Sequence, residues 1–432
     1  MGVIMIWNRT RECMSRDERM DMQGKKLVAL IKRVYHDIHY YRKKMQEQGL
    51  EPGDIRDIED LNKLPYTTEE DLTKLPISYD MQMKCHTLSV SDGLKNLARY
   101  TANDIRMWSE CIARTLSMTG LCRNDTIQVA YSYDLASCGL LTRCAIEQIG
   151  ALLAPSAIYK TRELISKMRE IGITGILCTP SHLLRIAKTV EELGCTKELQ
   201  LKAALCGEES FDETTRLYLE KQLHSKVYDT YNISELTSAG IAGECTHQQG
   251  MHIQEDFFAA EVLGDNTHTN ATDTTQGELV LTTLELENNP LVRYRTNEYV
   301  TITNKPCACG RSTSRITRTV CDNIISKESF MIRGLCISTQ QLRLALERIN
   351  DIKAYYIIHL NKKFNLDMVD VEIIPKDIKQ DLSEKDTNTI KNKVVNILQH
   401  ILGITPKTII INRENNWYFS NKTVVILDHR NL

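Results

Sequence analysis

The sequence predicts an α/β protein with a large N-terminal region and a small α+β unit at the C-terminus. Strand-like and helix-like segments alternate from about residue 100 to residue 230, which indicates a parallel sheet covered by helices. After residue 250 the pattern turns to antiparallel strands. The 432 residues exceed the usual size of one compact core, so we expect domains at 1–325 and 326–432.

The N-terminal segment is predicted to be helical. Between residues 15 and 48, apolar residues recur at three- and four-residue steps, as on one face of a helix. They are Leu27, Leu30, Ile31, Val34, Ile38 and Tyr41. Residues 57–76 read as short helices separated by prolines.

The middle of the chain supplies the predicted parallel sheet. The expected strands are 126–131, 151–155, 175–178, 201–206 and 225–229. The expected helices are 101–115, 140–150, 160–171, 181–193 and 212–223. Ligands of such sheets bind beyond the carboxyl ends of the strands, so we look for a site after Tyr131, Cys178, Cys206 and Asp229.

The remaining elements are predicted to be antiparallel strands and then a mixed unit. The expected strands are 258–263, 278–284, 291–294 and 299–303, followed in the small unit by 354–360, 367–374, 408–412 and 423–428. The expected helices of the small unit are 338–348 and 387–401.

Composition excludes several classes of function. A net charge of −2 gives no argument for nucleic acid as a partner. No window reaches the roughly 18 apolar residues of a membrane span, and the N-terminus lacks the apolar core of a secretion signal. The fourteen cysteines are dispersed without an export signal, which favours reduced thiols and a cytoplasmic location.

Three segments contain polar clusters next to strand-like runs: Tyr228–Glu235 (YDTYNISE), Gly277–Glu298 (ending in RYRTNE) and Ser420–Arg430 (SNKTVVILDHR). Together they resemble the signatures of adenylate-forming enzymes, and among these the phenylacetate–CoA ligases. The resemblance covers nearly the whole chain. It implies the adenylate-forming fold with a mobile C-terminal domain, and the use of ATP, Mg²⁺ and CoA.

The loop YNISE is expected to bind Mg–ATP. The resemblance implies that Ser234 faces a phosphate and that Glu235 holds the magnesium ion, with Tyr231 and Asn232 in the same loop. Asn232 replaces a family glycine, and asparagine tolerates the positive φ of a turn. Without the resemblance, a Ser-Glu helix cap would be the better interpretation.

The adenosine part of ATP is assigned by the same resemblance. Gly207 and Glu209, in LCGEESF, correspond to the segment that lines the adenine. Glu298 stands where the family has an aspartate on the ribose hydroxyls, and Arg318 stands where the family has an arginine near the ribose and the hinge. Asp322 is the candidate hinge residue. The alternative for LCGEESF is a strand-to-helix loop with acids at a helix N-terminus.

Lys422 is the candidate catalytic lysine. Its position in SNKTVVILD corresponds to that of a mobile family lysine that neutralises charge as the acyl-adenylate forms. The alternative is a solvated lysine at the edge of a strand.

Four residues are candidate ligands of a structural zinc ion: Cys245, His252, Cys307 and Cys309. Three thiolates and one imidazole suit tetrahedral zinc, and phenylacetate–CoA ligases carry a comparable set. The alternative is buried thiols beside a surface histidine.

The phosphate loop departs from the family pattern. In LSVSDGLKN only Ser89, Ser91 and Gly93 match, while Val90 and Asp92 replace small or hydroxyl residues. Glycine amides and hydroxyls cradle polyphosphate, whereas valine crowds it and aspartate repels it. The aromatic-substrate segment, YSYDLASCGLL, is also altered.

The leading function is an aryl acid–CoA ligase that forms acyl-CoA, AMP and diphosphate from a small aryl carboxylic acid. One alternative is an adenylyltransferase with another acceptor, such as a deazaflavin coenzyme. The other is a degenerate paralogue that binds a nucleotide or acyl ligand without turnover. The sequence leaves the acid, the acceptor and the oligomeric state open, with a homodimer among the options.

Overall fold

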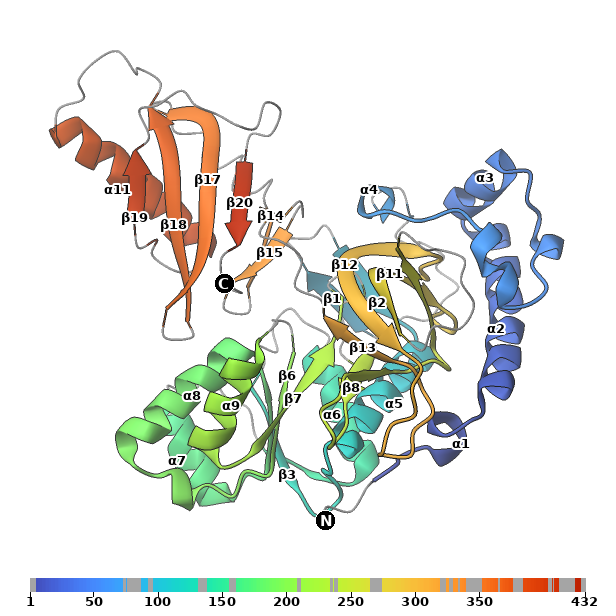
Figure 1. Ribbon diagram of the computed structural model, residues 1–432, viewed down its shortest axis with the longest axis horizontal. Coiled ribbons are helices and arrows are strands. Elements are labelled where there is room, and N and C mark those ends of the chain that lie inside the picture. Colours follow the sequence, from blue (N-terminus) through green and yellow to red (C-terminus); the bar gives the residue numbers. More distant parts are fainter. Residues whose placement is uncertain are drawn as a thin grey trace. The chain divides into compact units, whose positions relative to one another are not determined.

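The computed structural model describes residues 5–72, 75, 87–91, 96–130, 138–154, 161–207, 211–233, 236, 240–264, 274–318, 324–325, 329–332, 335–338, 352–363, 366–375, 384–402, 406, 408–411 and 424–428. The chain separates into two compact units (Figure 1). The first comprises Met1–Cys178, Ile186–Glu208 and Leu219–Thr319, and the second comprises Thr179–Arg185, Glu209–Tyr218 and Val320–Leu432.

An eleven-stranded mixed sheet forms the framework of the first unit, in the order β10-β11-β12-β13-β9-β8-β7-β6-β5-β3-β4. The parallel part contains β3 (Thr126–Val129), β4 (Leu152–Ala154), β5 (Gly175–Cys178), β6 (Ala203–Cys206) and β7 (Lys226–Tyr231). The antiparallel part contains β8 (Ala242–Glu244), β9 (Met251–Ile253), β10 (Phe258–Leu263), β11 (Thr274–Thr283), β12 (Tyr294–Thr303) and β13 (Arg315–Arg318). The predicted fold class is confirmed.

The helices between the parallel strands also match the prediction. They are α5 (Ala102–Met118), α6 (Cys138–Ile149), α7 (Thr161–Ile171), α8 (Pro180–Leu193) and α9 (Glu213–Leu223), with a short 3-10 turn, η3, at Thr196–Glu198. Helix α5 begins after Thr101, whose side chain forms a reciprocal capping box with Asp104. Its buried Trp108 packs on Phe258 with the ring centroids 5.4 Å apart, which ties the helix to the antiparallel strands.

The N-terminal helical face is divided between two helices, α2 (Arg16–Asp37) and α3 (His39–Glu47), because Ile38 is extended. Helix α2 buries Leu27, Leu30 and Ile31 in a cluster with Ala259 and Leu284 at the antiparallel strands. The other short elements are α1 (Arg9–Glu12), η1 (Pro52–Asp54), η2 (Glu59–Lys63) and α4 (Glu69–Leu72).

The antiparallel strands differ from the prediction around RYRTNE. Two strands were expected, but residues 294–303 form the single strand β12. Its pairing with β11 changes register between Glu278 and Val280, and Asn297 adopts a left-handed φ of 56°. Strands β8, β9 and β13 were missed because three or four residues are too few to show an alternating pattern, and no predicted helices flank them as they flank the equally short parallel strands.

The phosphate-loop segment contains the antiparallel strands β1 (Thr87–Ser91) and β2 (Asn96–Tyr100). The predicted strand and helix assignments for this part of the chain did not include them.

The second unit contains a five-stranded sheet in the order β14-β20-β17-β18-β19 and the hairpin β15-β16. Its elements are β14 (Ile324–Ile325), β15 (Ser329–Ile332), β16 (Leu335–Ser338), β17 (Ile352–Lys363), β18 (Leu366–Pro375), α11 (Glu384–Leu402), β19 (Thr408–Ile411) and β20 (Val424–Asp428). A helix was predicted at 338–348. Its first residue, Ser338, is the last residue of β16, and residues 339–348 lie outside the described residues.

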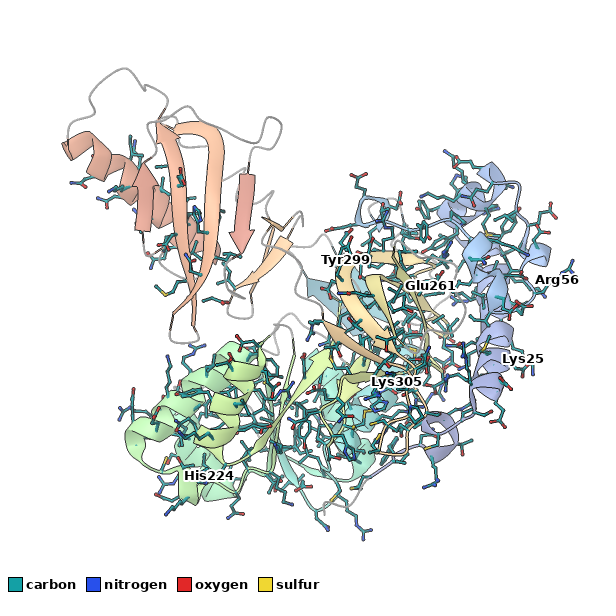
Figure 2. The ribbon with its side chains drawn as sticks, viewed as in Figure 1. Lys25, Arg56, His224, Glu261, Tyr299 and Lys305 are labelled. Carbon is teal, nitrogen blue, oxygen red and sulfur yellow. The ribbon has the colours of Figure 1, made fainter. Side chains whose placement is uncertain are left out.

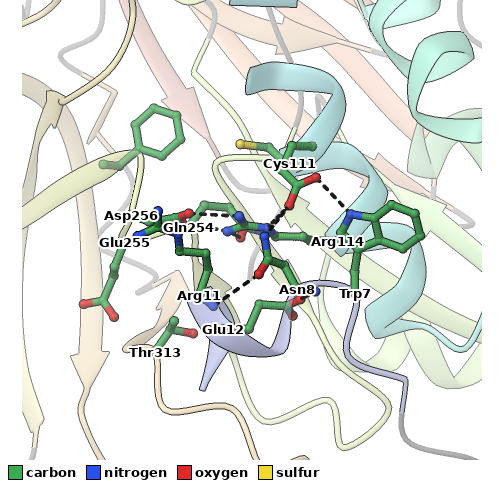
Figure 3. A network of polar contacts seen from close by, with 12 residues as sticks. Trp7, Asn8, Arg11, Glu12, Cys111, Arg114, Gln254, Glu255, Asp256 and Thr313 are labelled. Carbon is green, nitrogen blue, oxygen red and sulfur yellow. Dashed lines mark hydrogen bonds and ion pairs between the residues drawn. The ribbon is translucent and has the colours of Figure 1, made fainter. Parts of the chain in front are cut away.

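A buried ion pair joins α5 to the turn before β10 in the first unit (Figure 3). Arg114 donates to both carboxylate oxygens of Asp256, at 2.7 and 2.9 Å, and its Nε donates to Glu110 at 3.0 Å. Burial alone lowers the pKa of Arg114, but the bonds and the charge of Asp256 outweigh burial and raise it. Both side chains of the pair are almost fully buried.

We expect Asp256→Asn to lower the free energy of unfolding by about 3–5 kcal/mol, because it leaves a buried guanidinium with an incomplete counter-charge. Urea denaturation measures this change. The control is Arg143→Gln, which breaks an ion pair with Glu147 whose side chains are both 60% exposed and should cost less than about 1 kcal/mol. Equal losses in the two variants would contradict the expectation.

Candidate nucleotide site and candidate metal centre

Strand β7 lies where the sheet changes from parallel to antiparallel. It pairs in parallel with β6, with Cys206 opposite Asp229, and antiparallel with β8, with Tyr231 opposite Ala242. The carboxyl ends of β6 and β7 therefore lie side by side, and Gly207 follows β6 at that edge, where it is buried. This is the edge at which open α/β sheets bind ligands.

Three predicted site residues meet at this edge. Arg318 forms an ion pair with Asp229 and donates to the Thr230 carbonyl at 3.2 Å. Its guanidinium lies 5.4 Å from the centroid of the Tyr231 ring. Burial raises the pKa of Tyr231 well above its usual value, and the nearby charge of Glu298 raises it further. Glu298 and Arg318 thus lie close to one buried tyrosine, although 20 residues separate them in the sequence.

Burial lowers the pKa of Arg318, but the charges of Asp229 and Glu298 outweigh that effect and raise it. The guanidinium therefore stays charged between two carboxylates. Asp229 was not among the predicted site residues. Its position as an acid at the carboxyl end of a predicted strand is the signal that could have identified it.

Asn232 shapes the loop after β7 in a way that the sequence did not predict. It does not adopt a positive φ. Instead its amide oxygen accepts a hydrogen bond of 2.7 Å from the backbone N–H of Gly240. Gly240 has a φ of 94°, and a Cβ there would lie 3.2 Å from the backbone of Cys111. The Asn232 side chain therefore ties the end of β7 to Gly240, just before β8.

Arg293 anchors the start of RYRTNE, a role that the sequence prediction missed. It has a left-handed φ of 46°. Its guanidinium forms an ion pair of 2.7 Å with Glu261, a residue that is labelled in Figure 2. It also donates to the carbonyls of Asn62 and Leu64 and lies 4.1 Å from the centroid of the Tyr66 ring. These contacts fix the beginning of β12, and hence the position of Glu298 along it.

Several predicted site residues lie outside the described residues, namely Gly93, Glu209, Ser234, Glu235, Asp322 and Lys422. For Ser89 and Ser91 the structure describes the backbone only, on β1. Their assigned roles stay predictions.

The four candidate zinc ligands come together in the first unit. One donor atom from each of Cys245, His252, Cys307 and Cys309 lies within 4.8 Å of the other three, and all four residues are buried. The Sγ atoms of Cys245 and Cys307 are 3.7 Å apart, and Cys309 Sγ is 3.4 Å from His252 Nε2. Tetrahedral zinc with Zn–S bonds of about 2.3 Å separates its sulfurs by roughly 3.8 Å, so the donor set fits zinc.

The surroundings of the cluster also fit a metal. His252 Nδ1 is 3.0 Å from the Thr313 hydroxyl, which orients the ring so that Nε2 faces the thiols. Contact with Cys307 raises the pKa of Cys245, and contact with Cys245 lowers the pKa values of Cys307 and Cys309. The ionisation of each thiol therefore depends on its neighbours, as expected for closely packed titratable groups.

Comparisons with known proteins agree with this architecture. The family model described as the AMP-binding enzyme C-terminal domain matches residues 335–430. A phenylacetate–CoA ligase of Escherichia coli (strain K12) is 27% identical over 98% of this chain and 97% of its own length. One from Thermus thermophilus is 28% identical over 85% of this chain and 84% of its own. The crystal structure of a 2-hydroxyisobutyryl-CoA ligase in its thioesterification state matches with a TM-score of 0.83 and 19% identity, covering 98% of this chain and 93% of that one.

The chain therefore has the fold of the adenylate-forming enzymes. Along nearly its whole length, the chain is similar to the phenylacetate–CoA ligases. Among the helices that the structure describes, none combines the length and the apolar character needed to cross a membrane.

Proposed function

We propose that this protein is an ATP-dependent aryl acid–CoA ligase. The carboxylate attacks the α-phosphorus of ATP and displaces diphosphate, and the CoA thiol then attacks the acyl-adenylate and releases AMP. The observation that carries the proposal is the match to phenylacetate–CoA ligases over 98% of the chain. The cluster of Tyr231, Glu298 and Arg318 at the sheet edge supports it.

The proposed roles follow the chemistry of each group. Glu298 accepts hydrogen bonds from the ribose hydroxyls, and Arg318 holds that region with its paired charge. Gly207 leaves room for the adenine beside β6. Glu235 holds Mg²⁺ on the phosphates of ATP, with Ser234 donating to a phosphate oxygen.

The proposed catalytic lysine is Lys422, and it belongs to the proposed mobile domain, residues 326–432. Its ammonium group neutralises the charge that develops on the α-phosphate and the carboxylate. Rotation of the domain then takes the lysine away before the thiol attacks.

Acid-dependent ATP–diphosphate exchange, screened over aryl and aliphatic acids, tests the first half-reaction. Exchange with an aryl acid, followed by CoA-dependent release of AMP, supports the proposal. Exchange without thioester formation favours an adenylyltransferase with another acceptor, for example a deazaflavin. The absence of exchange with any acid, together with retained ATP binding, favours a binding protein without turnover.

We expect the phosphate loop to limit the affinity for ATP, because Val90 crowds the phosphates and Asp92 repels them. Val90→Gly combined with Asp92→Thr should tighten ATP binding by about five- to tenfold, since removing one like charge from a partly screened site is worth on the order of 1 kcal/mol. Isothermal titration with ATP measures this. Unchanged affinity would mean that the phosphates bind elsewhere.

We propose that the cluster of Cys245, His252, Cys307 and Cys309 holds a structural zinc ion. A bound zinc ion would cross-link the segment after β8 to the segment before β13. The protein is proposed to work in the cytoplasm, because none of the cysteines whose side chains the structure describes forms a disulfide.

A further inference from the structure

Arg315, on β13, is a buried cation without an acidic partner among the described residues. It is 5% exposed. Its guanidinium donates to two backbone carbonyls, that of Gln249 at 2.6 Å and that of Lys305 at 3.0 Å, and Nε has no hydrogen-bond partner within the described part of the chain. A buried charge that contacts only neutral carbonyls is costly unless an opposite charge lies nearby.

The position of Arg315 relates it to the metal cluster. It is the register partner of His252 in the antiparallel pair β13–β9, so the two side chains lie on the same face of the sheet. Gln249 lies between Cys245 and His252, and Lys305, labelled in Figure 2, lies two residues before Cys307. One guanidinium therefore bonds to both segments that carry the thiol ligands.

Two other buried arginines near the cluster already have carboxylate partners, and one of them, Arg311, also interacts with Cys309. Arg311 pairs with Glu12, and both side chains are 1% exposed. Arg19 pairs with Glu255 at 3.0 Å and donates to Ser312 at 3.4 Å. Among these three cations, only Arg315 lacks a carboxylate in the described residues.

Zinc bound by three thiolates and one neutral imidazole carries a net charge of −1, because three negative charges exceed the two of Zn²⁺. We propose that Arg315 is a positioning residue for the metal: its charge balances the zinc–thiolate centre, and its planar fork holds the two ligand-bearing segments together. This inference rests on the proposed zinc ion, so the wild-type metal content is measured first. A wild-type protein purified without zinc would overturn the zinc site itself, and this inference with it.

Competition with a chromophoric chelator measures the affinity for zinc in wild type, Arg315→Met, Arg315→Lys and Arg19→Gln. We expect Arg315→Met to weaken zinc binding by about 10–100-fold, the usual effect of losing an outer-shell partner. Arg315→Lys keeps the positive charge but not the planar guanidinium, so it should lose less affinity for zinc than Arg315→Met. Arg19→Gln is the control. It removes a buried arginine that contacts Ser312, three residues after Cys309, and whose charge Glu255 already balances. This variant should keep the wild-type affinity for zinc.

Thermal unfolding with and without bound zinc gives a second readout that does not depend on enzyme activity. Zinc should raise the Tm of Arg315→Met by less than it raises that of wild type, because the coupling between the arginine and the metal is reciprocal. If wild type contains zinc, any of three outcomes would overturn the inference. The first is a zinc affinity of Arg315→Met within twofold of wild type, and the second is an equal loss of zinc affinity in Arg315→Lys and Arg315→Met. The third is a zinc-induced rise of Tm that is equal in Arg315→Met and wild type. The Lys variant and the Arg19 control keep the test informative if Arg315→Met folds poorly.

Discussion

Lys422→Ala should reduce acid-dependent ATP–diphosphate exchange by about 100-fold or more. That is the usual scale for losing one preorganised electrostatic partner of a transition state. The lysine lies two residues before β20, which pairs with β14 and β17 in the small sheet, and it is outside the described residues. Stability should change little, because the substitution falls outside the strand itself.

The two half-reactions separate this role from a general loss of function. Thioester formation from a preformed acyl-adenylate should fall much less than exchange, since domain rotation is expected to remove the lysine before that step. Lys391→Ala, on helix α11 of the same unit, is the matched control and should leave both steps unchanged. Equal losses in the two half-reactions would refute the assigned role.

Cys309→Ser should abolish stoichiometric zinc binding and lower the free energy of unfolding by about 4 kcal/mol or more, because the metal's binding energy contributes to folding. Elemental analysis and urea denaturation measure these two effects. Cys195→Ser is the control, because Cys195 is also a buried thiol but lies on the loop after α8, where its Sγ contacts the Val190 carbonyl.

A strong chelator gives an independent check of the same expectation. It should destabilise wild type and the Cys195 variant, and should leave Cys309→Ser unaffected. Zinc-free wild-type protein, or a Cys309 variant as stable as wild type, would count against the metal centre.

The order of elements could be predicted from the sequence because it depends on local periodicity. The buried strand Gly175–Cys178 and helix α9 were predicted within one residue, and the sequence also indicated the four residues of the candidate metal cluster. Short strands such as β8 and β9 were missed, since three residues carry no measurable alternation.

The electrostatic partners could not be predicted, because they depend on contacts between distant segments. Asp229 pairs with Arg318 across 89 residues, and Glu261 pairs with Arg293 across 32. No local pattern indicates such a pair. The position of Asp229 at the end of a strand marks it as a site candidate but does not identify its partner, and Glu261 looks like an ordinary strand residue in the sequence.

The sequence by itself determined the class of fold, the likeness to the phenylacetate–CoA ligases and the identity of the candidate ligands, because propensity and motif spacing are properties of neighbouring residues. Only the tertiary structure showed that Asn232 holds its loop through Gly240, and that Arg315 contacts both ligand-bearing segments without an acidic partner among the described residues. The reason is physical: hydrogen bonds and charge compensation act over a few ångströms in space, and the fold alone decides which residues come that close.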